Sequence, residues 1–186
     1  PAMAVQYGEA LRPFRPYFIE EPVPAENVDA MLEVKNALAG IPIATGERLV
    51  TRYAFREILE KDAAHVLQPD LCHCGGLWEA RKIAAMAETY YVSMAPHNPL
   101  GPIATMVNLH FGFAVPNFLI QEAIRSDVPW RNDVVNDPVV VENGFVMLPD
   151  KPGFGIEVNE AEAAKHPFQQ EVLMQTYHAD GSVADW

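Results

Sequence analysis

The chain has 186 residues, of which 49% are hydrophobic and 20% charged, and its formal net charge at pH 7 is −12. This apolar fraction excludes a disordered chain, and the length allows one domain with a substantial core. The acidic balance argues against a nucleic-acid partner and an anionic membrane surface, and no apolar run is long enough for a transmembrane helix.

Short apolar runs alternate along the chain with longer amphipathic runs. Residues 1–16 have the pattern of the middle of a helix and its exit, so we expect a chain cut from something longer. Strands are predicted over 17–19, 41–45, 65–68, 91–95 and 118–121, and helices over 25–39, 52–61, 77–89 and 103–114. Thr51 is the predicted N-cap of the helix over 52–61. This alternation favours a parallel sheet with helical crossovers.

The alternation ends after residue 124. Asn143-Gly144 separates two β-rich runs, 139–142 and 145–148, and predicts a two-residue hairpin. A short helix is expected near 160–165, and the tail from 178 to 186 is polar. The pattern therefore divides the chain into residues 1–125 and a C-terminal segment, residues 126–186.

Two cysteines, Cys72 and Cys74, are one residue apart, which is a strained spacing for a disulfide. Two thiols favour a reducing compartment, and we expect a cytoplasmic protein. With His73 they lack the second ligand pair of a zinc site, so we interpret them as a loop that contains thiols. Arg48 either faces a substrate or pairs with a neighbouring carboxylate. The histidines that we interpret as structural are His65, His110, His166 and His178.

One ionisable residue follows each predicted strand, and the five are Glu20, Glu47, Asp70, His97 and Glu122. Their spacings are 27, 23, 27 and 25 residues. Units of about this length build (β/α)₈-type barrels, whose active sites lie at the C-terminal ends of the strands. Any one of these residues would most often be a solvated loop residue. Five in register predict side chains that meet in one mouth.

The residue types indicate roles. Glu20 and Glu47, on neighbouring strands, suit a hard cation such as Mg²⁺, which prefers oxygen ligands. His97 can act as a base near neutral pH, and Asp70 could hold the tautomer of its imidazole. Glu122 could donate or share a proton opposite that base.

At these residues the sequence resembles the enolase superfamily, specifically its mandelate racemase-like group, and is most similar to acid-sugar dehydratases of the galactonate type. The similarity covers essentially the whole chain. The motifs that carry it are FIEEP at 18–22, TGER at 45–48, QPD at 68–70 with Gly75-Gly76, APHNPLGP at 95–102, Gln121-Glu122, and SVADW at 182–186.

The resemblance implies an α/β fold that is the C-terminal portion of a modified TIM barrel, (β/α)₇β. Residues 1–125 would carry the active-site strand ends, and residues 126–186 would pack on an α+β capping domain. It implies a Mg²⁺-dependent hydro-lyase acting on a sugar acid. The base would remove the C2 proton of a 2-hydroxy acid, the enediolate would expel the C3 hydroxyl, and a 2-keto-3-deoxy acid would result.

The resemblance also implies a role for each site residue. Glu20 and Glu47 match two of three metal ligands. Asp70 and His97 match an Asp–His dyad in which His97 is the base. Glu122 matches the acid that hydrogen-bonds the substrate carboxylate as it becomes an enolate.

The third metal ligand and the leaving-group acid of this family belong to an Asp-x-His motif just upstream of Pro1, so the chain departs from the pattern there. A half barrel would leave a sheet edge open. We therefore expect the chain to belong to a longer polypeptide or to pair with another chain, and we expect a homo-oligomer. Two alternatives remain: a racemase or epimerase of a 2-hydroxy acid using the same dyad, or a non-catalytic incomplete fragment that serves assembly or binding.

Overall fold

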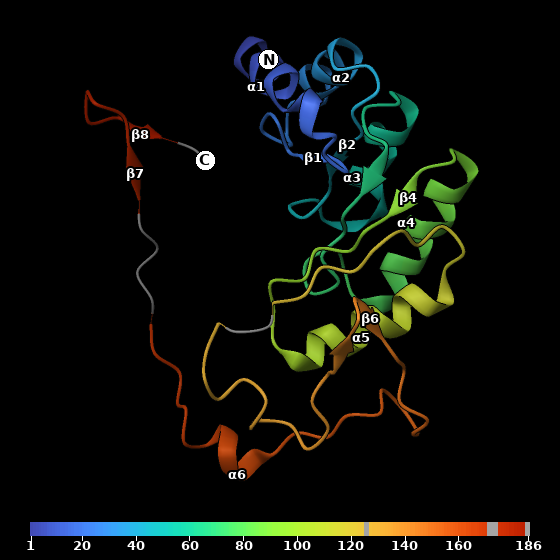
Figure 1. The fold of residues 1–186 in the computed structure, drawn as a ribbon, viewed down its shortest axis with the longest axis vertical. Helices are drawn as coiled ribbons and strands as arrows, with labels where there is room; N and C mark the ends of the chain where they lie inside the picture. The colour runs from blue at the N-terminus through green and yellow to red at the C-terminus, as the bar shows by residue number, and fades with distance from the viewer. Residues whose placement is uncertain (125–126, 171–174, 185–186) are drawn as a thin grey trace.

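The computed structural model describes residues 1–124, 127–170 and 175–184 (Figure 1). The first part runs through α1 (Ala2–Leu11), the 3₁₀ helix η1 (Arg12–Phe14), β1 (Ile19–Glu20), α2 (Val28–Ala37), β2 (Ile43–Thr45), α3 (Thr51–Glu60), β3 (Val66–Leu67), α4 (Leu77–Thr89), β4 (Ser93–Met94) and α5 (Pro102–Ala114). The predicted alternation of strand and helix is confirmed over this part. The helical start that residues 1–16 predicted is present as α1.

Four strands form one open parallel sheet in the order β1-β2-β3-β4. Along it, Ala44 is paired with Glu20 on one side and with Val66 on the other. Neighbouring strands are thus joined in chain order, each by a helical crossover, as in part of a barrel. The carboxyl ends of the four strands therefore lie along one edge.

The predicted fifth strand, over 118–121, is present only as an isolated parallel bridge between Met94 and Phe118. Met94 N donates to Asn117 O, and Leu119 N donates to Met94 O, both at 2.8 Å. The next donor of the ladder would be the N–H of residue 96, which is a proline and has none. The prediction of a full strand is wrong because Pro96 ends the ladder.

The two faces of the sheet have different side chains, since residues alternate along each strand. Ile43, Leu67 and Met94 point toward the helices and join the main core. The large core side chains around them include Met31, Leu38, Phe55, Ile83 and Phe111. The opposite face has smaller residues, Ala44, Val66 and Ala95, with Phe18 and Leu119 against them. This second face adjoins the site.

Two helix starts differ from the sequence prediction. Helix α2 begins after Asn27, whose side chain accepts from Ala30 N at 3.0 Å, and not at residue 25. Thr51 is not the N-cap of α3: it is the first helical residue, with φ at 62°. The main-chain amide of Arg52, in the first turn of the helix, is instead satisfied by Glu79 of α4, whose Oε1 accepts from Arg52 N at 3.0 Å.

The C-terminal segment holds β5 (Val141–Glu142), β6 (Phe145–Val146), α6 (Glu160–Ala163), β7 (Thr176–Tyr177) and β8 (Val183–Ala184). The predicted hairpin is confirmed as the antiparallel pair β5–β6, with positive φ at Asn143 and Gly144. The pair β7–β8 was not predicted. Residues 125–126, at the predicted boundary, and the last two residues of the 182–186 motif lie outside the described residues.

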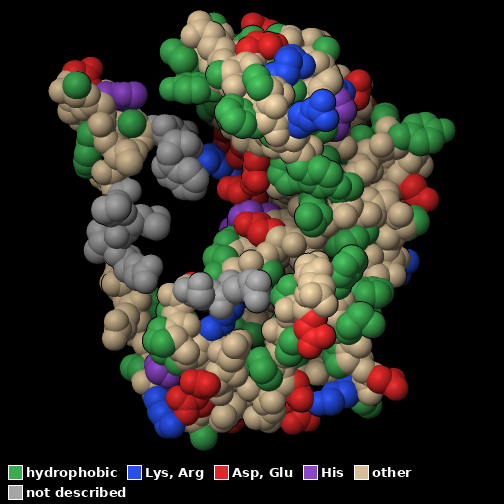
Figure 2. Space-filling view, viewed as in Figure 1, with side chains coloured by type: hydrophobic (Ala, Val, Ile, Leu, Met, Phe, Trp, Pro, Cys, Tyr) green, Lys and Arg blue, Asp and Glu red, His purple; other side chains and the backbone are tan. Residues whose placement is uncertain are grey.

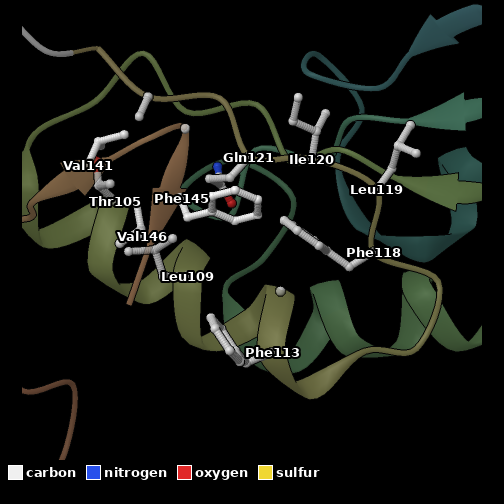
Figure 3. A pocket seen from close by; sticks show the side chains of 13 residues that line it. Thr105, Leu109, Phe113, Phe118, Leu119, Ile120, Gln121, Val141, Phe145 and Val146 are labelled. Carbon is white, nitrogen blue, oxygen red and sulfur yellow. The ribbon is translucent and has the colours of Figure 1, made fainter. Parts of the chain in front are cut away.

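An apolar cavity of about 520 Å³ separates the β5–β6 hairpin from α5 and the segment after it (Figure 3). Its walls include Leu109, Phe113, Phe118 and Phe145, together with the polar side chains of Thr105 and Gln121. No ionisable residue is among those that line it. Within the described ranges, none of the helices is both long enough and apolar enough to cross a membrane.

Candidate active site

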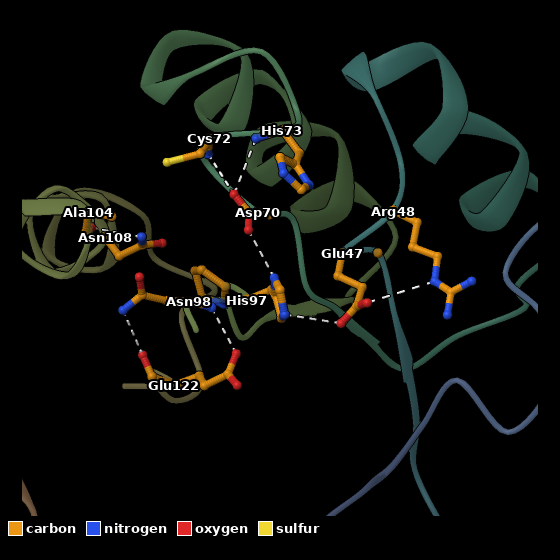
Figure 4. A network of polar contacts seen from close by, with 12 residues as sticks. Glu47, Arg48, Asp70, Cys72, His73, His97, Asn98, Ala104, Asn108 and Glu122 are labelled. Carbon is orange, nitrogen blue, oxygen red and sulfur yellow. Dashed lines mark hydrogen bonds and ion pairs between the residues drawn. The ribbon is translucent and has the colours of Figure 1, made fainter. Parts of the chain in front are cut away.

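The imidazole of His97 lies between two carboxylates at the carboxyl ends of the strands (Figure 4). Its Nδ1 is 2.9 Å from Asp70 Oδ2, and its Nε2 is 3.1 Å from Glu47 Oε2. The three residues come from the loops after β4, β3 and β2. The structure thus brings together three of the five side chains that the strand-end spacing singles out.

The side chain of Asp70 is held by its own loop as well as by its contact with the imidazole. Its side chain is 1% exposed, and its Oδ1 accepts from Cys72 N at 2.7 Å and from His73 N at 3.2 Å. The other oxygen is left for His97. The Asp70 carboxylate can accept the Nδ1 proton of the ring, whereas the Nε2 atom faces the Glu47 carboxylate.

Glu47 lies among other charged groups. Burial raises the pKa of its carboxyl, and the nearby carboxylates of Glu21 and Glu20 add to the rise, whereas His97 and Arg48 oppose it. Arg48 Nε is 3.4 Å from Glu21 Oε2 and 3.8 Å from Glu47 Oε1. Of the two alternatives for Arg48, the structure therefore shows pairing with neighbouring carboxylates.

Glu20 and Glu47 line one cavity of about 440 Å³, which Glu21 and Arg48 also border. Figure 2 shows acidic and histidine side chains gathered where this face of the molecule is hollowed. Among the described residues, no group of three or more His, Cys, Asp or Glu side chains is placed to hold a metal ion. Glu20 and Glu47 fit a hard cation as part of an oxygen-ligand set, because both are carboxylates and both line the same cavity.

Glu122 is joined to the site by Asn98, the residue that follows His97 in the chain. Its Oε2 accepts from Asn98 N at 2.8 Å, and its main-chain oxygen accepts from Asn98 Nδ2 at 3.1 Å. Glu122 is therefore joined to the loop that carries His97.

Sequence reasoning missed Glu21 and Asn98 as contributors to the site. Glu21 Oε1 accepts from Thr45 Oγ1 at 3.0 Å and from Gly46 N at 3.4 Å, so it ties the end of β1 to the loop that carries Glu47. Both residues directly follow a candidate residue, and that adjacency was the available signal. Their side-chain contacts join different strands, which no local pattern reveals.

The remaining chemistry-bearing residues have structural contacts. His65 Nδ1 accepts from Ile43 N at 3.1 Å, and burial lowers the pKa of this ring. His110 Nε2 lies 3.1 Å from Phe154 O, and His166 stacks on Trp130. Both cysteines are free thiols, Cys72 exposed and Cys74 buried. These contacts favour the structural interpretation of the three histidines.

Comparisons with known proteins agree with this arrangement. Residues 1–162 match the family described as Enolase C-terminal domain-like. The chain is 40% identical to D-galactonate dehydratase of Variovorax paradoxus (strain S110) and 41% identical to D-galactonate dehydratase of Ralstonia pickettii (strain 12J), in each case over 99% of this chain and 50% of the relative.

Solved structures give the same result. An enolase from Agrobacterium radiobacter, with bound Na and L-malate, superposes with a TM-score of 0.92 at 36% identity, over 98% of this chain and 50% of that one. A mandelate racemase/muconate lactonizing enzyme-like protein from Roseovarius sp. TM1035 gives 0.85 at 44% identity, over 91% of this chain and 42% of that one. The chain spans about half the length of the relatives that it matches.

Proposed function

The chain belongs to the enolase C-terminal domain-like family, and from that premise we propose that it supplies the base and two metal ligands of a Mg²⁺-dependent acid-sugar dehydratase. The substrate class is a galactonate-like aldonate, and the product is a 2-keto-3-deoxy acid formed through an enediolate. One observation carries the proposal: the His97 imidazole lies 2.9 Å from Asp70 and 3.1 Å from Glu47, so base and candidate metal ligand face the same space. The names of the relatives support the substrate class.

In this proposal His97 removes the C2 proton of the substrate. Asp70 accepts the Nδ1 proton of the ring, which aims the Nε2 lone pair at the substrate and stabilises the imidazolium that forms. The Nε2 atom of the ring is the atom that takes the proton. Arg48 and Glu21 hold the loop that carries Glu47.

The C2 proton of a carboxylate is weakly acidic, so developing charge must be stabilised. Glu20 and Glu47 would hold Mg²⁺, which supplies Lewis-acid stabilisation of the substrate carboxylate. Glu122, in its protonated form, would donate a hydrogen bond to that substrate carboxylate as the charge on the carboxylate grows. The third metal ligand and the acid that protonates the leaving C3 hydroxyl are proposed to come from the other half of the longer protein.

The proposal also covers the domain division, the partners and the cellular location of the protein. Residues 1–125 are proposed as the barrel part, and 126–186 as the segment associated with a capping domain. The rest of the barrel, and a second copy in a homo-oligomer, are the expected partners. The cytoplasm is the proposed location, because two free thiols suit a reducing compartment.

A screen of the full-length protein against a library of acid sugars with Mg²⁺ tests the function, with detection of 2-keto products. Formation of a 2-keto-3-deoxy acid from an aldonate is the expected result. A C2 epimer without loss of water would replace dehydration by racemase or epimerase chemistry. Absence of any turnover, with weak Mg²⁺ binding, would leave the non-catalytic alternative.

A further inference from the structure

The position of Glu122 is not maintained by the sheet. The main-chain ladder from β4 to the segment at 117–121 has its last bond at Leu119 N, which donates to Met94 O at 2.8 Å. Pro96 has no N–H to continue it. Glu122 lies three positions beyond Leu119, the end of this ladder, and a side chain at the end of an unpaired segment needs other contacts to have one orientation.

Two side-chain amides lie beyond the last main-chain hydrogen bond of this ladder. Gln121 Nε2 donates to Pro96 O at 3.2 Å and to Glu122 O at 2.8 Å. Asn98 Nδ2 donates to the same Glu122 O at 3.1 Å and to Thr105 Oγ1 at 2.9 Å. A carbonyl can only accept, so the contact with Glu122 O settles which end of the Asn98 amide faces it.

Asn98 is fully buried, with 0% of its surface exposed. Thr105 anchors it, since Thr105 Oγ1 donates in turn to Gly101 O at 3.1 Å. The main-chain N–H of Asn98 donates to the Glu122 carboxylate, Oε2, at 2.8 Å. One residue thus contacts both the backbone and the carboxylate of Glu122, and its own backbone continues directly from His97.

We propose that Asn98, anchored by Thr105 and assisted by Gln121, is a positioning residue that orients the Glu122 carboxylate relative to the base His97. The inference rests on the proposed function for the role of Glu122. The set of hydrogen bonds that joins Asn98, Thr105 and Gln121 to Glu122, here called the clamp, is observed directly. The clamp replaces the main-chain hydrogen bonds that the ladder lacks beyond Leu119. A displacement of a group in an active site by about 1 Å can lower the rate about a hundredfold.

The kinetic test uses the full-length enzyme and Asn98→Asp, which keeps the shape but replaces the Nδ2 donor by an acceptor facing Glu122 O. Asn108→Asp is the matched control. Asn108 is also a buried amide, and its Nδ2 donates to Ala104 O at 2.9 Å, away from Glu122. We expect Asn98→Asp to lower kcat for dehydration about tenfold to a hundredfold with KM little changed, and Asn108→Asp to leave kcat within about twofold.

A double mutant separates positioning from general stability. If Asn98 acts through Glu122, Asn98→Asp causes no further loss of kcat in a Glu122→Gln background. Equal losses of kcat in Asn98→Asp and Asn108→Asp, or a loss that adds fully to that of Glu122→Gln, would overturn the proposal.

A second measurement does not depend on activity. Hydrogen exchange of the Asn98 main-chain amide reports its bond to Glu122. Thr105→Val removes the anchor and Thr105→Ser retains it, so we expect exchange at least about tenfold faster in the first variant and near wild type in the second. Unchanged exchange in Thr105→Val would overturn the clamp. If the wild-type enzyme dehydrates no sugar acid but this pattern is seen, the proposed function fails and the clamp remains. If Asn98→Asp does not fold, the Thr105 pair decides.

Discussion

Asp70 and His97 form a pair in which both oxygens of the buried Asp70 carboxylate have partners. Asp70 Oδ2 lies 2.9 Å from His97 Nδ1, while Oδ1 accepts two main-chain N–H groups of its own loop. The loop therefore orients the carboxylate, and the carboxylate orients the ring. His97 Nε2 is left facing Glu47, and the predictions below test the parts of this arrangement in turn.

Glu47→Gln in the full-length protein should weaken Mg²⁺ binding, because a neutral amide is a poorer ligand for a hard cation than a carboxylate. Titration calorimetry with Mg²⁺ alone measures this. Glu60→Gln, an exposed carboxylate on α3, is the control and should bind Mg²⁺ as wild type does. Unaltered metal affinity in Glu47→Gln would remove Glu47 from the ligand set.

Gly46→Ala should destabilise the fold and displace the loop that carries Glu47. Gly46 has φ at +143°, and a Cβ there would lie 2.9 Å from Gln68 N and from Phe55 Cε1. Two backbones approach closely at this point, so we expect a loss of about 1–3 kcal/mol in the free energy of unfolding. Gly101→Ala is the control, since no atom lies within 4 Å of its added Cβ. Equal stability of the two variants would contradict the packing described.

The ion pair between α3 and α4 should make stability depend on acid pH. The main-chain N–H of Arg52, together with its guanidinium and Lys82, lowers the pKa of Glu79 to about 2. A carboxyl with a lowered folded pKa stabilises the fold fully above its ordinary value of 4.5, and the contribution is lost as the pH falls toward 2.

Denaturant unfolding at a series of pH values should therefore show a steeper loss of stability between about pH 4.5 and pH 2 in wild type than in Glu79→Gln. Glu60→Gln should keep the wild-type slope. Parallel curves for wild type and Glu79→Gln would show that this contact does not stabilise the folded state.

The two cysteines should react differently with iodoacetamide. Cys72 is exposed, whereas Cys74 is buried and its burial raises the pKa of its thiol to about 11. Near pH 8, peptide mapping by mass spectrometry should find the label on Cys72 and not on Cys74 in the folded protein, and on both residues in the denatured protein. Rapid labelling of Cys74 in the folded protein would contradict the burial of this loop.

Much of the site could be predicted from the sequence because its candidate residues follow strands of a repeating unit. Regular spacing was enough to bring Glu47, Asp70 and His97 to one edge. The Asn143-Gly144 hairpin was predictable for a similar reason, since its turn chemistry is local.

The errors come from contacts between distant segments. The amide of Arg52 is satisfied by Glu79, 27 residues further along the chain, and this contact replaces the local cap expected at Thr51. The fifth strand failed for a related reason. That Pro96 ends this hydrogen-bond ladder can be predicted only when its register with Leu119 is known. Register is a property of the assembled sheet.

The central claim is that His97 removes the C2 proton of a 2-hydroxy sugar acid. Exchange of that proton in deuterated water, followed by NMR with the full-length protein and Mg²⁺, tests it most directly. We predict that His97→Asn lowers the exchange rate about 10²–10⁴-fold with an unchanged far-UV spectrum, and that the exposed control His178→Asn exchanges at the wild-type rate. Exchange at the wild-type rate in folded His97→Asn would contradict the assignment of His97 as the base.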